Sequence, residues 1–144
     1  MKEKDEIGDT DSEIGLAEQE FANYCEANEI DHDELAMEDE DCEGFRKIKS
    51  RFIKAINEKR LVVDGTKLVY TVSHFSETAG DRLTISRPKG KDFIAMDGFK
   101  ETQQVQKFNA FIASICGREK SYVSRLDMKD RLFLQDIGTL FITA

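Results

Sequence analysis

The fold class is decided by residues 60–72, which read RLVVDGTKLVYTV. Two β-rich runs flank Asp64-Gly65, a pair typical of tight turns, so this stretch predicts an antiparallel hairpin. A third alternating run over residues 82–86 predicts another strand, which Pro88 ends because proline cannot donate to a strand ladder. A small antiparallel sheet is therefore expected in the middle of the chain.

The segment upstream of the hairpin predicts an amphipathic helix. Apolar residues recur at intervals of three and four from Phe45 to Ile56, and lysines and arginines fill the remaining faces. This period is the one expected for a single apolar face of an α-helix. The helix is expected to begin the folded unit.

The segment downstream of the sheet is predicted to be helical. A short helix is expected over residues 91–97, a long one over 101–116 that ends at Gly117, and a terminal one over 128–141, with Ser121 and Asp127 as successive N-caps. The positions expected in the core are Val105, Phe108, Ile112, Ile115, Leu132 and Ile137. The sequence thus predicts an α+β fold in one domain, residues 45–144: an N-terminal amphipathic helix, a small antiparallel sheet (the hairpin plus one strand), then three or four C-terminal helices.

Residues 1–44 differ in composition from the rest of the chain. They hold 18 of the 29 acidic residues and two of the 21 basic ones, a net charge of −16, whereas residues 45–144 carry +8. Residues 1–12 show no apolar period and predict disordered chain, but Ala17, Phe21 and Tyr24 share one face of a short helix. We expect an acidic arm, partly disordered or weakly helical, that lies against the basic helix at residues 46–60. An interaction tail and a merely solvated segment are both left open.

The 144 residues contain no recognisable catalytic, cofactor-binding or metal-binding motif. Asp31-His32-Asp33 is rich in oxygen ligands, but a calcium loop starting there would need a ligand and a glycine where Leu35 and Ala36 stand. The three cysteines form no CxxC pair. A non-enzymatic protein without cofactor or metal is therefore expected. Neither a membrane-spanning run nor a signal-peptide core is visible, so the cytoplasm is the expected location.

Two short motifs occur in the C-terminal half. Pro88 and Asp92 follow a strand in the order Pro-x-x-x-Asp, and Leu126, Asp127 and Asp130 form Leu-Asp-x-x-Asp before the terminal helix. Over residues 67–144 this arrangement resembles the Mu-like family of bacteriophage tail assembly chaperones. That family has leucine three positions before the proline, where this chain has isoleucine, and its shorter members lack the acidic arm.

The resemblance implies a non-enzymatic chaperone that binds the tape-measure protein and keeps it soluble during tail assembly in the host bacterial cytoplasm. The tail-tube protein is a second expected partner, and a homo-oligomer is left open. A client helix with an apolar stripe needs an apolar docking surface. We expect Phe133, Leu140 and Phe141 to provide that surface, because the end of a chain is poorly covered by its own domain.

The alternative function is that of a basic, nucleic-acid-associated phage protein restrained by its acidic arm. Basic residues gather over 46–60 and 82–91, and such clusters attract phosphate groups. The aromatic residues fall in apolar helical stripes, however, so the sequence indicates no platform on which bases could stack. Nucleic acid is for this reason the less favoured partner.

Overall fold

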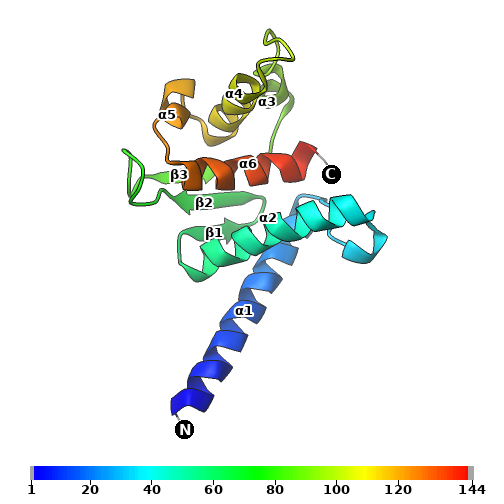
Figure 1. The fold of residues 1–144 in the computed structure, drawn as a ribbon, viewed down its shortest axis with the longest axis vertical. Helices are drawn as coiled ribbons and strands as arrows, with labels where there is room; N and C mark the ends of the chain where they lie inside the picture. The colour runs from blue at the N-terminus through cyan, green and yellow to red at the C-terminus, as the bar shows by residue number, and fades with distance from the viewer. Residues whose placement is uncertain (1, 143–144) are drawn as a thin grey trace.

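The computed structural model describes residues 2–142, with side chains from residue 15 onward (Figure 1). In chain order the elements are α1 (Lys2–Ala27), the 3-10 helix η1 (Glu34–Ala36), α2 (Asp39–Asn57), β1 (Leu61–Asp64), β2 (Lys67–Thr71), β3 (Arg82–Ile85), α3 (Gly90–Ile94), α4 (Gln104–Cys116), α5 (Lys120–Ser124) and α6 (Met128–Ile142). This order confirms the predicted α+β class. No helix among the described residues is long and apolar enough to cross a membrane.

The sheet has the order β1-β2-β3 with both pairs antiparallel. Gly65, at φ +61°, closes the hairpin that Asp64-Gly65 predicts. Burial alternates along the strands, so Leu68 and Tyr70 of β2 are fully buried while Val62 of β1 is 58% exposed. One face of the sheet therefore contacts the core and the other faces solvent, as is common in antiparallel sheets.

Helix α6 brings the other helices and the sheet together. It contacts both α2 and α4, and its Phe133 ring stacks on Tyr70 of the central strand with 4.5 Å between the ring centroids. Gly138 permits a close approach of α4, because a Cβ at this position would lie 3.1 Å from ring carbons of Phe108 and of Phe111. The buried side chains of these helices and of the sheet form one continuous core.

Helix α1 belongs to this core and packs on α2 (Figure 1). Phe21 and Tyr24 are buried, and the Phe21 ring lies 4.9 Å from the Phe52 ring of α2. The arm thus lies against the predicted basic helix mainly through apolar contacts, to which Glu34 and Arg46 add an ion pair of 3.4 Å. The core begins upstream of residue 45, where the sequence places the domain boundary. Residues 1–12 were expected to be disordered, but the backbone from Lys2 onward is part of α1, so that expectation is wrong; the side chains of residues 1–12 lie outside the described ones.

Two predicted helix boundaries are confirmed. Gly117 follows α4 at φ +65°, a left-handed conformation that glycine adopts without strain. Asp127 precedes α6, and its carboxylate accepts a hydrogen bond from the backbone N–H of Lys129 at 2.9 Å. This bond satisfies one of the unpaired donors at the start of the helix.

The predicted cap at Ser121 is wrong. Helix α5 begins at Lys120 with Glu119 in the N-cap position, so Ser121 lies inside the first turn. No side chain caps this helix, whereas Tyr122 and Val123 are buried in the core. Packing of these two residues, which the local sequence does not reveal, therefore decides where the short helix forms.

The expected core positions divide into buried and exposed residues. Ile112, Ile115 and Ile137 are buried as predicted, and Phe108 is partly buried against the core. Val105 and Leu132 are 59% and 40% exposed, so their assignment to the core is wrong. Val105 lies in the first turn of α4, whose buried positions begin later in the helix. On α6 the buried face includes Asp130 and Asp136, and an apolar pattern does not count these carboxylates as core residues.

Candidate functional site

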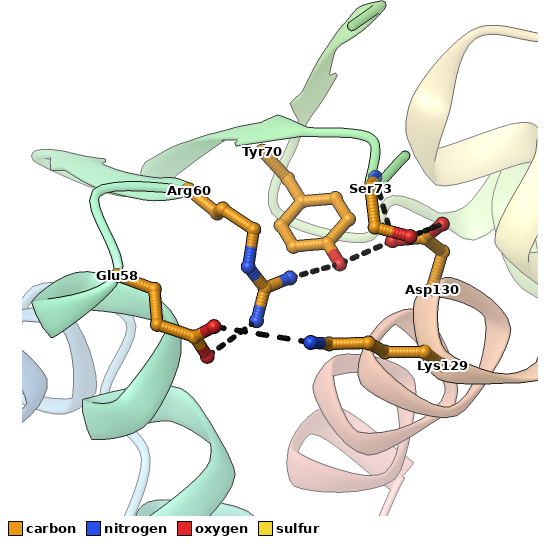
Figure 2. A network of polar contacts seen from close by, with 6 residues as sticks. All are labelled: Glu58, Arg60, Tyr70, Ser73, Lys129 and Asp130. Carbon is orange, nitrogen blue, oxygen red and sulfur yellow. Dashed lines mark hydrogen bonds and ion pairs between the residues drawn. The ribbon is translucent and has the colours of Figure 1, made fainter. Parts of the chain in front are cut away.

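A polar network joins the end of α2 to the start of α6 (Figure 2). At the surface, Glu58 accepts a hydrogen bond from Arg60 Nη2 at 2.9 Å and lies 3.8 Å from Lys129 Nζ. Arg60 Nη1 donates to Tyr70 Oη at 2.7 Å, and Tyr70 donates to the Asp130 carboxylate at 2.6 Å. The network therefore runs from an exposed carboxylate to a fully buried one.

Four hydrogen bonds converge on the buried carboxylate of Asp130. Besides Tyr70, the donors are the backbone N–H of Ser73 at 3.0 Å, the Ser73 hydroxyl at 2.7 Å and the Ser76 hydroxyl at 2.5 Å. Ser76 Oγ also accepts from the backbone N–H of Asp127 at 2.7 Å, which ties the loop after β2 to the start of α6. A buried carboxylate needs such donors to stay ionised.

The pKa values of Asp130 and Tyr70 agree with a structural role for the network. Burial raises the pKa of Asp130, but the hydrogen bonds from Ser76, Tyr70 and Ser73 favour the charged form and lower it below its ordinary value overall. Burial raises the pKa of Tyr70, and the hydrogen bond to Asp130 raises it further. Asp130 has no exposed surface on which to meet a substrate. The network thus fixes the position of α6 against the sheet.

A groove lies where η1 and the start of α2 meet the end of α6, and its volume is about 550 Å³. We call it the acidic groove; its lining residues are Ile30, Asp31, Ala36, Met37, Glu38, Glu40, Asp41, Gly44, Phe45, Ile48, Thr139 and Leu140. Four of these residues, Ile30, Phe45, Ile48 and Leu140, also belong to the core, so the groove has an apolar floor. Cavities of this size accommodate several side chains of a ligand or partner.

An ion pair holds the two helices that form this floor. Arg51 donates to the Asp136 carboxylate from Nε at 2.5 Å and from Nη2 at 2.9 Å. Asp136 is 5% exposed, so this bidentate pair lies partly out of water, where such geometry is strongest. Arg51 follows Ile48 by one turn of α2, and Asp136 precedes Leu140 by one turn of α6. The pair therefore fixes the spacing of the groove's two walls.

The three residues predicted to bind a partner lie in three different settings. Phe133 is 5% exposed, so its predicted place on the surface is wrong. Leu140 is 2% exposed, which also contradicts the expected exposure, although it lines the acidic groove. Phe141 is partly buried, 6.3 Å from the Tyr24 ring and 5.9 Å from the Arg87 guanidinium. At the end of α6, a contact comes from α1, treated as a separate arm in the sequence prediction: its Tyr24 ring is the one near Phe141.

Sequence reasoning missed most of the acidic groove. Residues 31–44 draw attention through their acidic composition alone, which hides the contribution of Ile30 and Met37. Ile30 stands alone between Glu29 and Asp31, and Met37 ends the short run Leu35-Ala36-Met37, so neither belongs to a helical or strand period. The signal that could have found the groove is the pairing of these two residues with the apolar face that begins at Phe45.

A second cavity of about 610 Å³ adjoins the acidic groove and shares Ile30 and Asp31 with it. It contains polar side chains that have partners within the chain: His32 lies 3.6 Å from Glu26, and Arg46 forms an ion pair with Glu34 at 3.4 Å. Because these side chains already have partners within the chain, this cavity is the weaker candidate for a partner site.

The cysteines and histidines indicate no reactive centre in the described part of the chain. Burial raises the pKa of Cys25 and of Cys116 to about 12, so both thiols stay protonated at neutral pH. His74 lies against Phe75 with 4.0 Å between the ring centroids. No group of three or more His, Cys, Asp or Glu among the described residues is arranged to hold a metal ion.

No protein-family model matches the chain, and comparisons with curated proteins and with solved structures found no match. The interpretation of the acidic groove therefore rests on its own geometry and charge.

Proposed function

We propose that this chain is a phage or prophage tail assembly chaperone that binds the tape-measure protein and keeps it soluble, without enzymatic activity. The observation that carries the proposal is the acidic groove, an open concave surface with an apolar floor. An amphipathic client helix buries its apolar stripe in a groove of this kind.

The size of the groove suits reversible binding. A volume of about 550 Å³ takes a few apolar side chains of a client, not a whole helix. Binding energy grows with the number of well-buried anchors, so a short floor gives a moderate affinity. A chaperone whose client is later displaced by the tail-tube protein needs an affinity of that order.

The residues that carry the family resemblance have roles in the fold. Asp92 accepts a hydrogen bond from the backbone N–H of Lys89 at 2.7 Å and another from the Ser114 hydroxyl, which joins the start of α3 to α4. Asp127 caps α6, and Asp130 anchors it to the sheet. These carboxylates support a shared architecture and lie apart from the lining of the acidic groove.

The nucleic-acid alternative receives less support from the basic residues. Arg51 is paired with Asp136 and Arg60 with Glu58, so two of the arginines in the basic segment are used inside the molecule. Arg87, from the second basic segment, donates to the backbone carbonyl of Asn28. Arginines that are held in this way offer less of their charge to a phosphate backbone. We therefore give client binding priority.

The test is co-expression of the chaperone with the tape-measure protein of the same phage. Gly44 lines the acidic groove, and a Cβ built on it meets no atom within 4 Å, so Gly44→Gln places a side chain in the groove without a clash. Gly15 of α1 is also exposed and uncrowded but lies outside the groove, so Gly15→Gln is the matched control.

The expected result is that wild type and Gly15→Gln keep the client in the soluble fraction, while Gly44→Gln loses most of this effect. Circular dichroism of each purified variant verifies that it is folded. Equal solubilisation by all three proteins would move the client surface away from the acidic groove. Insoluble client with the wild type would overturn the proposed function itself.

A further inference from the structure

The rim of the acidic groove carries four carboxylates. Asp31, Glu38, Glu40 and Asp41 are all exposed, and no Lys, Arg or His stands among the lining residues. Among the described side chains, none of the four forms an ion pair, although Asp31 accepts a local hydrogen bond from the backbone of Asp33. The groove thus combines an apolar floor with uncompensated negative charge.

Two neighbouring acidic residues that do not line the groove form ion pairs. Glu34 lies 3.4 Å from Arg46, and Glu43 lies 3.8 Å from Lys47, one turn along α2. Basic side chains are therefore available close by, yet they pair with carboxylates that do not line the groove. The lining of the groove thus holds four carboxylates and no basic side chain to balance them.

Helix stability accounts for part of this pattern but not for all of it. Glu40 and Asp41 lie in the first turn of α2, where negative charge complements the helix dipole. Asp31 lies eight residues before that helix begins, so the dipole of α2 gives no reason for its charge at the rim. Like charges that are held together at one opening repel each other, and a bound cation relieves the repulsion.

We infer that the occupant of the acidic groove is an amphipathic helical segment with lysine or arginine on both flanks of its apolar stripe. This inference rests on the proposed function and names the chemistry of the client segment. The apolar stripe lies along the floor beside Met37, which is only partly buried, while the flanking cations lie beside the rim carboxylates. Charge selects the segment, and burial of its apolar side chains supplies the affinity.

The test uses two synthetic 18-residue helices with the same leucine stripe, one flanked by lysines and the other by glutamates. Fluorescence anisotropy of each labelled peptide is measured with the full-length protein at about 50 mM salt, where charges at this range are weakly screened. We expect the lysine peptide to bind at least about tenfold more tightly, because each exposed charge pair contributes up to a factor of about five. Equal affinities would overturn the inference.

A neutralised rim separates this local effect from the net charge of the chain. The rim variant is Asp31→Asn, Glu38→Gln, Glu40→Gln and Asp41→Asn; its control, with the same change in net charge, is Glu18→Gln, Glu20→Gln, Glu77→Gln and Glu101→Gln. The control residues are exposed and lie outside the groove. The rim variant should lose most of the preference for the lysine peptide, and the control should keep it. An equal loss in both would show a general attraction and overturn the inference.

The outcomes also distinguish this inference from the proposed function. If the client is solubilised through the groove but the lysine peptide shows no preference, the inference fails and the function stands. If the lysine peptide is preferred but no client is solubilised, the function fails and the charge selectivity stands. Self-association that Gly44→Gln abolishes, seen by sedimentation, would make a second copy the occupant and overturn both.

Discussion

Carboxylates serve opposite purposes on the buried face of α6 and at the rim of the acidic groove. Both aspartates on α6 are buried: Asp130 accepts four hydrogen bonds, and Asp136 accepts two from Arg51 of α2. Glu38, Glu40 and Asp41 are exposed, and no ion pair engages them among the described side chains. The buried aspartates stabilise the fold, whereas the rim carboxylates can be replaced without loss of a tertiary contact.

This contrast shows where negative charge contributes to stability. A buried charge stabilises the fold only when its partners are complete, and the removal of one side of such an arrangement is costly. An exposed charge without a partner contributes little to stability and is available for binding.

Phe133→Ala should cost about 3–5 kcal/mol of unfolding free energy, because its ring is buried and stacked on Tyr70. Leu132→Ala, at the neighbouring and 40% exposed position, should cost under about 1 kcal/mol. Urea denaturation of both variants measures the two losses. Comparable losses would mean that α6 presents a different face to the core from the one described.

The same helix shows what could be predicted from the sequence. The hairpin, the third strand and helices α2, α4 and α6 follow from local periods, because Asp64-Gly65 and the apolar spacing of these helices act over a few residues. The rotation of α6 could not be predicted, since two of its buried positions are occupied by aspartates whose donors lie far away in the chain. Tyr70 reaches Asp130 across 60 positions, and Arg51 reaches Asp136 across 85.

Less of the candidate site than of the fold could be predicted from the sequence. Its floor joins Ile30, Phe45 and Leu140, which come from three separate segments. One of these was expected to contact a partner, but as an exposed residue at a free chain end. That expectation fails because Leu140 is 2% exposed and belongs to the same core as Phe45 and Ile48. Packing between distant segments does not show in the local spacing of apolar residues, so the sequence alone does not reveal it.

Asp130→Asn should cost about 2–4 kcal/mol at pH 7, because an amide replaces a charged acceptor that holds four hydrogen bonds. The matched change at the rim, Asp41→Asn, should cost under about 1 kcal/mol, since it removes only an exposed charge near a helix start. Thermal and urea unfolding at pH 7 give both values. A small cost at Asp130 would indicate that the hydroxyl donors rotate to accommodate the amide.

The pH dependence of the Asp130 variant follows from the direction of its pKa shift. The folded pKa of Asp130 is lowered, so its ionised form stabilises the fold above the ordinary pKa of about 3.9, and this contribution disappears as the pH falls through the folded value. The difference in stability between wild type and Asp130→Asn should therefore be greatest near neutral pH and should narrow below about pH 4. A constant difference down to pH 3 would contradict the lowered pKa.

Gly138→Ala should destabilise the protein by about 1–2 kcal/mol, because the added methyl group crowds a packed helix contact. Its Cβ would lie 3.1 Å from ring carbons of Phe108 and Phe111, and Phe111 is fully buried and cannot easily move. Denaturant unfolding measures the loss. In a protein that already carries Phe108→Leu, the free-energy cost of Gly138→Ala should be smaller. If the cost is unchanged, the crowding comes from Phe111 alone.

Gly44→Ala should change stability in the opposite direction. Gly44 lies inside α2 and is exposed, and a Cβ built on it meets no atom within 4 Å. Alanine restricts the unfolded chain more than glycine does and fits the helical backbone, so a gain of about 0.5–1 kcal/mol is expected. Both glycine variants gain one methyl group, so denaturant unfolding of the two compares the same change at two places.

A loss of stability with Gly44→Ala would show that the acidic groove is too narrow for an added methyl group and that its wall already lies against the core. A gain there with a loss at Gly138 means that the chain tolerates added volume at the groove but not at the helix contact, which is the property that a binding surface separate from the core requires.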